Sequence, residues 1–579
     1  MLEFIQTLLQ SYQRVLHANP HDARISKVYA QRIDQLILAE ALLRKKQLLQ
    51  HNPQLPPQIV VIGPTQAGKS SVVNVLLGSP NAVVSPLAGY TVHAQGFCHE
   101  IKINQCDGLQ QYFGRYQQLT PEQLQRERLD CFALTETQTP TAHLPPAVLW
   151  DTPDFDSIGA VGYKEGLIRT LALADVIVLV VSKEKYADQS VWDMMSAIAP
   201  LQQPTFICVN KLSEGTEEVI VRSLHDKWCQ ARSDVFPAVL TLPYHKQASD
   251  LVWPAQQRAT LFDLVTQGLQ QRTQPLQQDF TRYHWQKWLE PVYAEQAVAQ
   301  QWLALCQHNI KLAQDAYQRD YLNHPQHYAT FQTALVELLN LLEIPGMASL
   351  LAHTRSALLW PVKKLMQLGR QAAAFPDSSQ EVQLLQQIAE HTLIQLADQI
   401  LEQSAKHELA GWWKELALTL RQQRPTLLGE FQRAAQHYHD GFKQQIAVTA
   451  QHLYLKLQEL PMVLNSLRAT RVSADAAAIA LTIKTGGVGV HDLFLAPAML
   501  AITSLLTESA LGSYMRRTEI ELKQQQLDAV AHLLTSTLLQ NLSNLPTQLP
   551  AQQFFHISAQ QVQAIEASFS EKRHGLRFL

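Results

Sequence analysis

The segment GPTQAGKS at residues 63–70 follows the pattern GxxxxGK[ST]. It lies between an apolar run, QIVVI, and a segment with helical spacing, SSVVNVLLG, which is the strand–loop–helix context of a phosphate-binding loop. Glycines let backbone N–H groups approach phosphate oxygens, and a helix N-terminus adds positive potential. The Lys69 ammonium is expected to reach the β- and γ-phosphates, and the Ser70 hydroxyl to bind Mg²⁺. The predicted nucleotide-binding residues of this loop are Gly63, Pro64, Thr65, Gln66, Ala67, Gly68, Lys69, Ser70 and Ser71.

Three downstream positions supply the other parts that a nucleotide site needs. Asp151 ends the apolar run AVLWD, where a carboxylate can hold Mg²⁺ through water. Asn210 and Lys211 end a later run, TFICVN, and are expected to contact the base. Thr91 precedes a predicted strand in the position of a metal-sensing threonine, for which Ser85 is an alternative. The predicted metal ligands are therefore Ser70, Thr91 and Asp151.

The order GPTQAGKSS, loop threonine, DTPD and NKLS resembles the G1–G4 boxes of translation-factor-class GTPases. The context GKSSVVNVLLG is similar to the Era-like and dynamin-like groups in particular, and the resemblance covers about residues 58–270. It implies an α/β P-loop domain with a mostly parallel sheet, GTP as substrate and Mg²⁺ as cofactor. It also implies that Asn210 bonds the guanine and that Lys211 lies along the base. Lys69, Thr91 and Gln66 are the residues to which the resemblance gives catalytic roles.

Three positions depart from the family pattern. Ser213 stands where the family has an aspartate that accepts hydrogen bonds from the guanine ring N–H and amino group, and Glu214 is a substitute if the turn shifts by one residue. Asp154 replaces the glycine of DxxG, so its carboxylate is expected to repel the γ-phosphate unless it is turned away or neutralised. Phe155 replaces a water-orienting glutamine, which leaves a water-positioning role for Gln66 or Thr65; a solvated loop amide is the alternative for Gln66.

Composition excludes several other classes. The chain has 579 residues, 46% apolar and 17% charged, with a net charge of −3, so no global positive field attracts nucleic acid. Its six cysteines lie far apart without a CxxC pair, which is typical of buried free thiols in a reducing compartment. The N-terminal MLEFIQTLLQSYQRV reads as an amphipathic helix instead of a signal peptide, and we expect a cytoplasmic protein.

The pattern of apolar residues divides the chain into five regions. Helical spacing predicts a helical segment at 1–50, alternating strands and helices predict a GTPase domain at 51–275, and Gln-rich helical sequence predicts a stalk or effector region at 276–473. An apolar hairpin at 474–513 precedes a helix and tail at 514–579. A large all-α region is therefore expected beside the α/β domain.

The apolar stretch 474–513 has two interpretations. Arginines flank it at 468, 471, 516 and 517, as expected of a hairpin that contacts anionic lipid headgroups. Its longest uncharged arm, 493–507, is too short to cross a bilayer as a helix, and a buried hairpin in an α domain is the other interpretation. The segment 350–375 combines Trp360 with lysines in a composition suited to an interfacial helix, and taken alone it is more typical of an ordinary surface helix with one apolar face.

These observations predict a Mg²⁺-dependent GTPase of dynamin-like type that couples its nucleotide state to the helical region and touches a membrane from the cytoplasmic side. Slow turnover without self-association through paired G domains is part of this hypothesis, and no nucleic-acid partner is expected. The alternatives are a soluble GTP-dependent switch or scaffold acting on a protein complex, a P-loop NTPase of relaxed specificity, and a nucleotide binder that does not hydrolyse.

Overall fold

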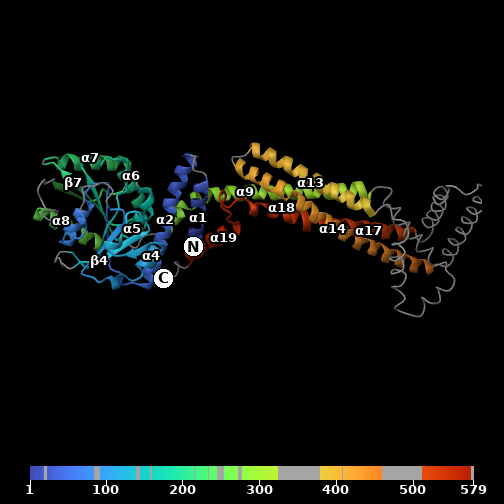
Figure 1. Ribbon diagram of the computed structural model, residues 1–579, viewed down its shortest axis with the longest axis horizontal. Helices are drawn as coiled ribbons and strands as arrows, with labels where there is room; N and C mark the ends of the chain where they lie inside the picture. Colours follow the sequence, from blue (N-terminus) through green and yellow to red (C-terminus); the bar gives the residue numbers. More distant parts are fainter. Residues whose placement is uncertain are drawn as a thin grey trace, which may run out of the picture. The chain divides into compact units, whose positions relative to one another are not determined.

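The structure is a computed structural model that divides into two compact units, Met1–Tyr293 with Ala551–Leu579, and Ala294–Pro550 (Figure 1). It describes residues 1–18, 23–83, 91–137, 144–156, 160–213, 215–232, 234–243, 253–271, 277–323, 378–406, 409–459 and 512–574.

The first unit is built on an eight-stranded sheet with the order β3-β4-β2-β5-β1-β6-β7-β8. All neighbouring strands are parallel except β2 and β5, which confirms the predicted mostly parallel α/β domain. The strands are β1 Gln58–Ile62, β2 Ala94–His99, β3 Gln117–Leu119, β4 Cys131–Glu136, β5 Ala147–Asp151, β6 Val176–Ser182, β7 Thr205–Leu212 and β8 Val239–Pro243.

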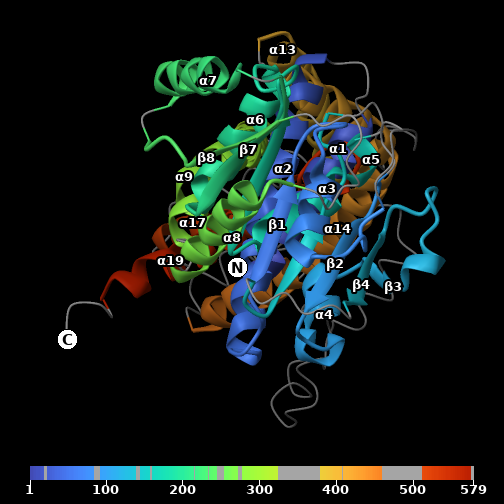
Figure 2. The same ribbon diagram turned by 90° about the vertical axis from the view of Figure 1, so that its left-hand side faces the viewer.

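Helices accompany the sheet in this unit (Figure 2). They are α1 Leu2–Ala18, α2 Ala23–His51, α3 Lys69–Leu77, η1 Ile103–Cys106, α4 Leu109–Phe113, η2 Pro121–Gln123, α5 Ala160–Leu173, α6 Gln189–Ile198, η3 Ala199–Leu201, α7 Glu217–Ala231, α8 Ala255–Gln270, the start of α9 Gln277–Tyr317, and α19 Ala559–His574.

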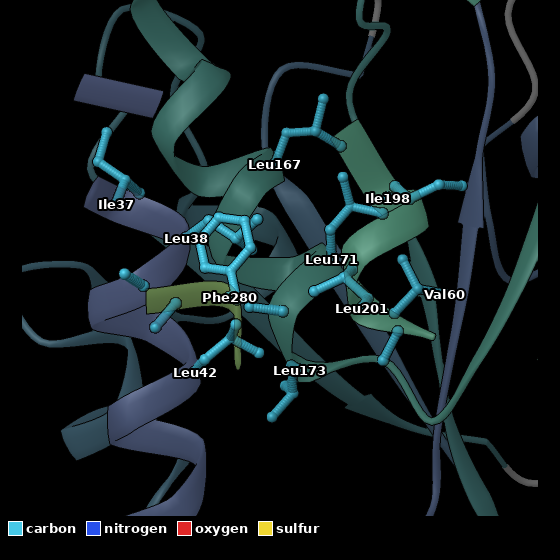
Figure 3. Packing of buried hydrophobic residues seen from close by; sticks show 14 of the residues in the cluster. Ile37, Leu38, Leu42, Val60, Leu167, Leu171, Leu173, Ile198, Leu201 and Phe280 are labelled. Atoms are coloured by element: carbon cyan, nitrogen blue, oxygen red, sulfur yellow. The ribbon is translucent and has the colours of Figure 1, made fainter. Parts of the chain in front are cut away.

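Alternate residues of each central strand point to opposite faces of the sheet, and each face has its own apolar core. On β1, Ile59 and Val61 pack in the cluster that contains α3 and α8. Val60 and Ile62 pack in the other cluster, with side chains from α2, α5 and α6 (Figure 3). The central strands are buried on both sides, which explains why their sequences are continuous apolar runs.

Six apolar runs predict strands and correspond to β1, β2, β5, β6, β7 and β8, while β3 and β4 were not predicted. The runs are QIVVIG, AQGFCHEIKI, AVLWDT, DVIVLVVS, TFICVN and PAVLTLP. The run expected to extend from Ala94 to Ile103 ends as a strand at His99. Glu100 has a φ of 55°, and the chain then turns into η1 at Ile103. Five cysteines are buried as expected, but Cys229 on α7 is exposed.

The predicted N-terminal helical segment consists of two helices, α1 and α2, and both pack within the first unit. The Tyr12 hydroxyl donates to the Trp288 carbonyl at 2.8 Å, and Trp288 Nε1 donates to Gln35 Oε1 at 3.0 Å. Trp285 Nε1 reaches Glu566 of α19 at 3.0 Å. Segments from the beginning, middle and end of the chain therefore form one helical layer beside the G domain.

The second unit is helical in the part that the structure describes. Its elements are the remainder of α9, the π-helix η4 Gln318–Leu322, α13 Ser378–Lys406, α14 Ala410–Gln458, α17 Gly512–Leu533, the π-helix η6 Leu534–Leu539, α18 Gln540–Asn544 and η7 Leu545–Gln548. The buried Glu381 carboxylate accepts hydrogen bonds from Tyr317 at 2.6 Å and from Gln526 at 2.9 Å, which ties α13 to α9 and α17.

Among the described residues no helix has the length and apolarity needed to cross a membrane. The two segments proposed as membrane contacts lie almost entirely outside the described residues: 350–375 does so completely, and only the last two residues of 474–513 are described.

Candidate functional site

The phosphate-binding loop follows β1, which lies between β5 and β6 in the middle of the sheet. Two of its glycines are required by close approach. A Cβ atom on Gly63 would lie 2.2 Å from the Val180 carbonyl oxygen of β6, and one on Gly68 would lie 2.2 Å from Asn210 Nδ2. Gly68 also has a φ of +99°, a conformation that favours glycine. Helix α3 begins at the next residue, Lys69, so its N-terminus faces the loop.

The end of β7 is fastened to the loop by two side chains that the sequence predicted as base contacts. Asn210 Nδ2 donates to the Ala67 carbonyl at 3.0 Å, and Lys211 Nζ donates to the Gln66 carbonyl at 2.7 Å. The Lys211 N–H also donates to Asn210 Oδ1 at 2.8 Å. Gln66 and Lys211 both have a φ of 61°, so two non-glycine residues in the left-handed region meet here. Such strain costs on the order of 1–3 kcal/mol per residue and concentrates at functional sites.

Lys69 forms a buried ion pair with Asp154, the residue that replaces the family glycine. The two side chains are 5% and 6% exposed, and Lys69 Nζ also lies 3.4 Å from the Pro64 carbonyl. The sequence left open how the negative charge of Asp154 is neutralised. In the structure Lys69, the residue expected to bind phosphate, neutralises it.

Asp151 and Ser70 meet where the sequence predicts the metal. Ser70 Oγ donates to Asp151 Oδ2 at 2.6 Å. Among the described residues Asp151 Oδ1 is buried and has no hydrogen-bond partner. Burial raises the pKa of Asp151 to about 6, although the Lys69 charge and the Ser70 hydrogen bond act in the opposite direction. An unpaired buried carboxylate oxygen beside a hydroxyl fits Mg²⁺, which prefers oxygen ligands.

Other predicted positions are less involved in these contacts. Thr91 lies three residues before β2, half-buried, and its metal role stays a prediction. Phe155 packs partly buried against the apolar core, in keeping with its lack of a hydrogen-bonding group. Ser71 is the third residue of α3. Ser213 is exposed and accepts a hydrogen bond from Lys183 Nζ at 2.8 Å. The alternatives Ser85 and Glu214 lie outside the described residues.

Sequence reasoning missed Asp156, which holds the loop from the opposite side. Its Oδ1 accepts from the Thr65 N–H at 2.6 Å and from Thr65 Oγ1 at 2.7 Å, and Lys185 pairs with its carboxylate. Burial opposes ionisation of Asp156, but the hydrogen bonds from Lys185 and Thr65 outweigh it and lower the pKa. The available signal was a third acidic residue in DTPDFD, close to a loop rich in N–H donors.

A central parallel strand followed by a phosphate loop, a carboxylate ending the adjacent strand and an Asn-Lys pair two strands away define a P-loop GTPase. Residues 58–211 match the model of the family described as 50S ribosome-binding GTPase. This segment is therefore a P-loop GTPase domain, as predicted, and membership of a GTPase family implies GTP binding and hydrolysis.

Solved structures that resemble the whole chain include bacterial dynamins. Two come from an oligomerised bacterial dynamin pair, described as a mechanism for long-range sensing and tethering of membranes. Both are 12% identical to this chain; one covers 92% of it and 91% of the matched chain with a TM-score of 0.34, the other 91% and 94% with a TM-score of 0.37. The bacterial dynamin GTPase LeoA from ETEC is 12% identical, with coverage of 92% and 97% and a TM-score of 0.24. No curated protein gives a significant match.

Proposed function

We propose that this protein is a Mg²⁺-dependent GTPase of dynamin-like type whose nucleotide state is transmitted to its helical elements. The observation that carries the proposal is the attachment of β7 to the phosphate loop through Asn210 and Lys211. Because both side chains bond to loop carbonyls, a nucleotide on the loop would have its base beside them. The phosphate loop and the end of β7 would thus position the phosphates and the base together.

Each residue has a defined part in this proposal. Lys69 and the N–H groups of residues 63–70 position the phosphates, while Ser70, Thr91 and Asp151, the last through water, would hold Mg²⁺. Bound Mg²⁺ neutralises charge on the β- and γ-phosphate oxygens. Lys69 carries three N–H donors, so it can turn from Asp154 toward phosphate or share its donors between the two. Asn210 and Lys211 contact the base.

Turnover is expected to be slow in the isolated chain, because Phe155 offers no group that could orient the attacking water. Gln66 and Thr65 are polar side chains of the loop, and Thr65 is already bonded to Asp156, while Gln66 has a left-handed backbone. We propose that Gln66 orients water when two G domains pair. Protein concentration should then raise the turnover per molecule.

Coupling to the helices would pass through α5, which begins at Ala160, shortly after Asp154 and Asp156. Arg169 of α5 is buried and pairs with Glu40 of α2 at 2.6 Å and with Glu165 at 2.8 Å. Moving α5 away from α2 would break the buried Arg169–Glu40 pair, although Arg169 would keep Glu165 and Glu40 would keep Arg44. A shift of α5 should therefore carry α2 with it.

The membrane part of the proposal rests on composition. Arg516 and Arg517 follow the apolar stretch at the start of α17, and both are exposed. Exposed cations next to apolar sequence suit a peripheral contact with an anionic bilayer surface, from the cytoplasmic side. A bilayer surface is the proposed partner of 474–513 and 350–375.

The test is phosphate release by the purified full chain with Mg²⁺ and GTP or ATP, with vesicles of phosphatidylcholine alone or with added phosphatidylserine. The Lys69→Ala variant serves as the blank. GTP-selective release that rises with anionic vesicles supports the proposal. If vesicles leave GTP turnover unchanged and the protein does not co-sediment with them, the membrane part is contradicted and a soluble switch is favoured. Equal turnover of ATP contradicts the choice of guanine.

A further inference from the structure

The loop after β6 brings a lysine to the place where the base edge would lie. Strands β6 and β7 are parallel, and Ser182, the last residue of β6, is paired with Asn210. The next residue, Lys183, reaches across to Ser213 and donates to its Oγ at 2.8 Å. The contact follows from strand register, because both residues continue neighbouring strands beyond the same edge of the sheet.

Ser213 is held in place independently of Lys183. Its carbonyl accepts hydrogen bonds from the Thr216 N–H at 3.1 Å and from Thr216 Oγ1 at 2.6 Å. Thr216 is the residue before α7, so this turn links Ser213 to the start of a helix. These two hydrogen bonds hold the Ser213 backbone in the turn between β7 and α7.

The chemistry of this pair is opposite to that of a carboxylate. An ionised aspartate only accepts hydrogen bonds, which matches the N1–H and 2-amino donors of guanine. Ser213 Oγ already accepts from Lys183, and it retains one O–H to donate. The Lys183 ammonium has two further N–H donors. The base edge is thus faced mainly by donors and by a positive charge.

We propose that Lys183 and Ser213 read position 2 of a purine as hydrogen-bond donors. The site then has no need of the 2-amino group of guanine and favours a purine with an oxygen at that position. Taken together with the proposed preference for guanine over adenine, this makes the substrate class 6-oxopurine nucleoside triphosphates, with the xanthine nucleotide bound most tightly. The inference rests on the proposed base position beside Asn210 and Lys211.

The size of the effect is large enough to measure. A site built to hydrogen-bond a substrate N–H rejects the analogue that lacks it by about 10⁴–10⁵-fold, because its own polar groups are left unpaired. Without a carboxylate that penalty disappears. ITP, which differs from GTP only by lacking the 2-amino group, should bind within about threefold of GTP.

The experiment is equilibrium competition of GTP, ITP, XTP and ATP against a fluorescent GDP analogue on the full chain with Mg²⁺. We expect ITP to match GTP and XTP to bind at least about tenfold more tightly than GTP. Lys183→Ala should weaken XTP by about tenfold and change GTP less than threefold. Ser213→Asp should reverse the order in favour of GTP. Lys311→Ala, which removes an exposed lysine of the other unit, is the matched control.

Several outcomes would overturn the assignment. ITP bound more than about 100-fold more weakly than GTP would show that an acceptor reads the 2-amino group. If Lys183→Ala lowered the affinities for GTP and XTP by the same factor, Lys183 would have no role at position 2. If Glu214→Gln alone abolished a preference for GTP over ITP, Glu214 would be the residue that recognises the 2-amino group. ATP bound as tightly as GTP would contradict the proposed GTPase specificity, whereas the XTP response of Lys183→Ala would still decide the inference.

Discussion

The two halves of the nucleotide site are held together by different kinds of contact. In the base half, made of Gln66, Ala67, Asn210 and Lys211, side-chain donors bond to backbone carbonyls. In the phosphate half, carboxylates occupy the groups that a nucleotide would use. Asp154 pairs with Lys69, Asp151 accepts from Ser70, and Asp156 holds Thr65.

Because of this difference, the base half could accept a ligand in its present geometry, whereas the phosphate half would have to rearrange. The base half uses carbonyl oxygens that a nucleotide has no reason to displace, so its geometry can stay as it is when a base arrives. In the proposed site, the phosphate half would have to share or release Lys69 and Ser70 before phosphate and metal could use them. Part of the phosphate-binding free energy is therefore offset by contacts that the protein already makes.

The largest expected effect comes from breaking the phosphate half at Lys69. Lys69→Ala should lower GTP turnover by about 10²–10³-fold, since a positioned positive charge is lost where charge develops in the transition state. Phosphate release at saturating GTP measures it. The double variant Lys69→Ala/Asp154→Ala is the control, because it also removes the buried carboxylate that pairs with Lys69. It should recover thermal stability and remain inactive; recovered turnover would contradict the role of Lys69.

Breaking the base half should act on affinity. Asn210→Ala removes the bond to the Ala67 carbonyl and a base contact, each worth about 1 kcal/mol, so GTP and GDP should both bind about 30-fold more weakly. Isothermal titration with both nucleotides measures the change. A loss of only about fivefold would mean that Asn210 serves only to fasten the loop, and unchanged affinity for both would contradict both roles.

Asp154→Asn, in the phosphate half, should raise the affinity for GTP instead of lowering it. It keeps the shape of the side chain but removes the negative charge that competes with phosphate for Lys69. GTP should bind about tenfold more tightly, equivalent to about 1.4 kcal/mol. Asp226→Asn, an exposed acid on α7, is the matched control and should leave the affinity unchanged. Weaker GTP binding by Asp154→Asn would show that the carboxylate assists the nucleotide.

The smallest effect concerns pH. With a pKa of about 6 for Asp151, its ionised fraction falls about fourfold between pH 7.5 and 5.5, and Mg²⁺ affinity should fall by the same factor. The folded-state pKa lies above the ordinary value of 3.8, so the ionised carboxylate lowers stability above pH 6. Without Mg²⁺, acidification from pH 6 toward 4 should relieve that cost. Mg²⁺ titrations across pH check this, and Asp151→Asn should flatten the dependence.

Local patterns in the sequence were enough to predict the central sheet and to single out the candidate site residues beside it. The phosphate loop follows β1, Asp151 ends β5, and the Asn210–Lys211 pair lies near the end of β7. These strands are apolar and buried on both faces, so spacing and periodicity indicate the positions directly. Strand β3, at the edge of the sheet, has only three residues, none of them buried, so it carries no apolar run. Strand β4 was missed although the first four residues of CFALTE are buried.

Contacts between residues far apart in the chain could not be predicted in this way. Thr65 meets Asp156, and Gln66 meets Lys211, only after five strands have been ordered in the sheet. The burial of Glu381 among donors from three other helices likewise has no local signal. Long-range partners depend on topology, which one sequence without an alignment does not contain.

The helical layer beside the G domain has a consequence for protein synthesis. The Ser11 hydroxyl donates to the Phe555 carbonyl at 3.4 Å, and the Tyr12 and Phe555 rings lie 4.9 Å apart. On a ribosome, residues 13–554 must be made between Tyr12 and Phe555, which takes roughly 30–110 s at typical elongation rates. During that time the aromatic face of α1 has no Phe555 to cover it. The nascent GTPase domain would thus be finished last by sequence made after the helical unit, and it would need protection until then.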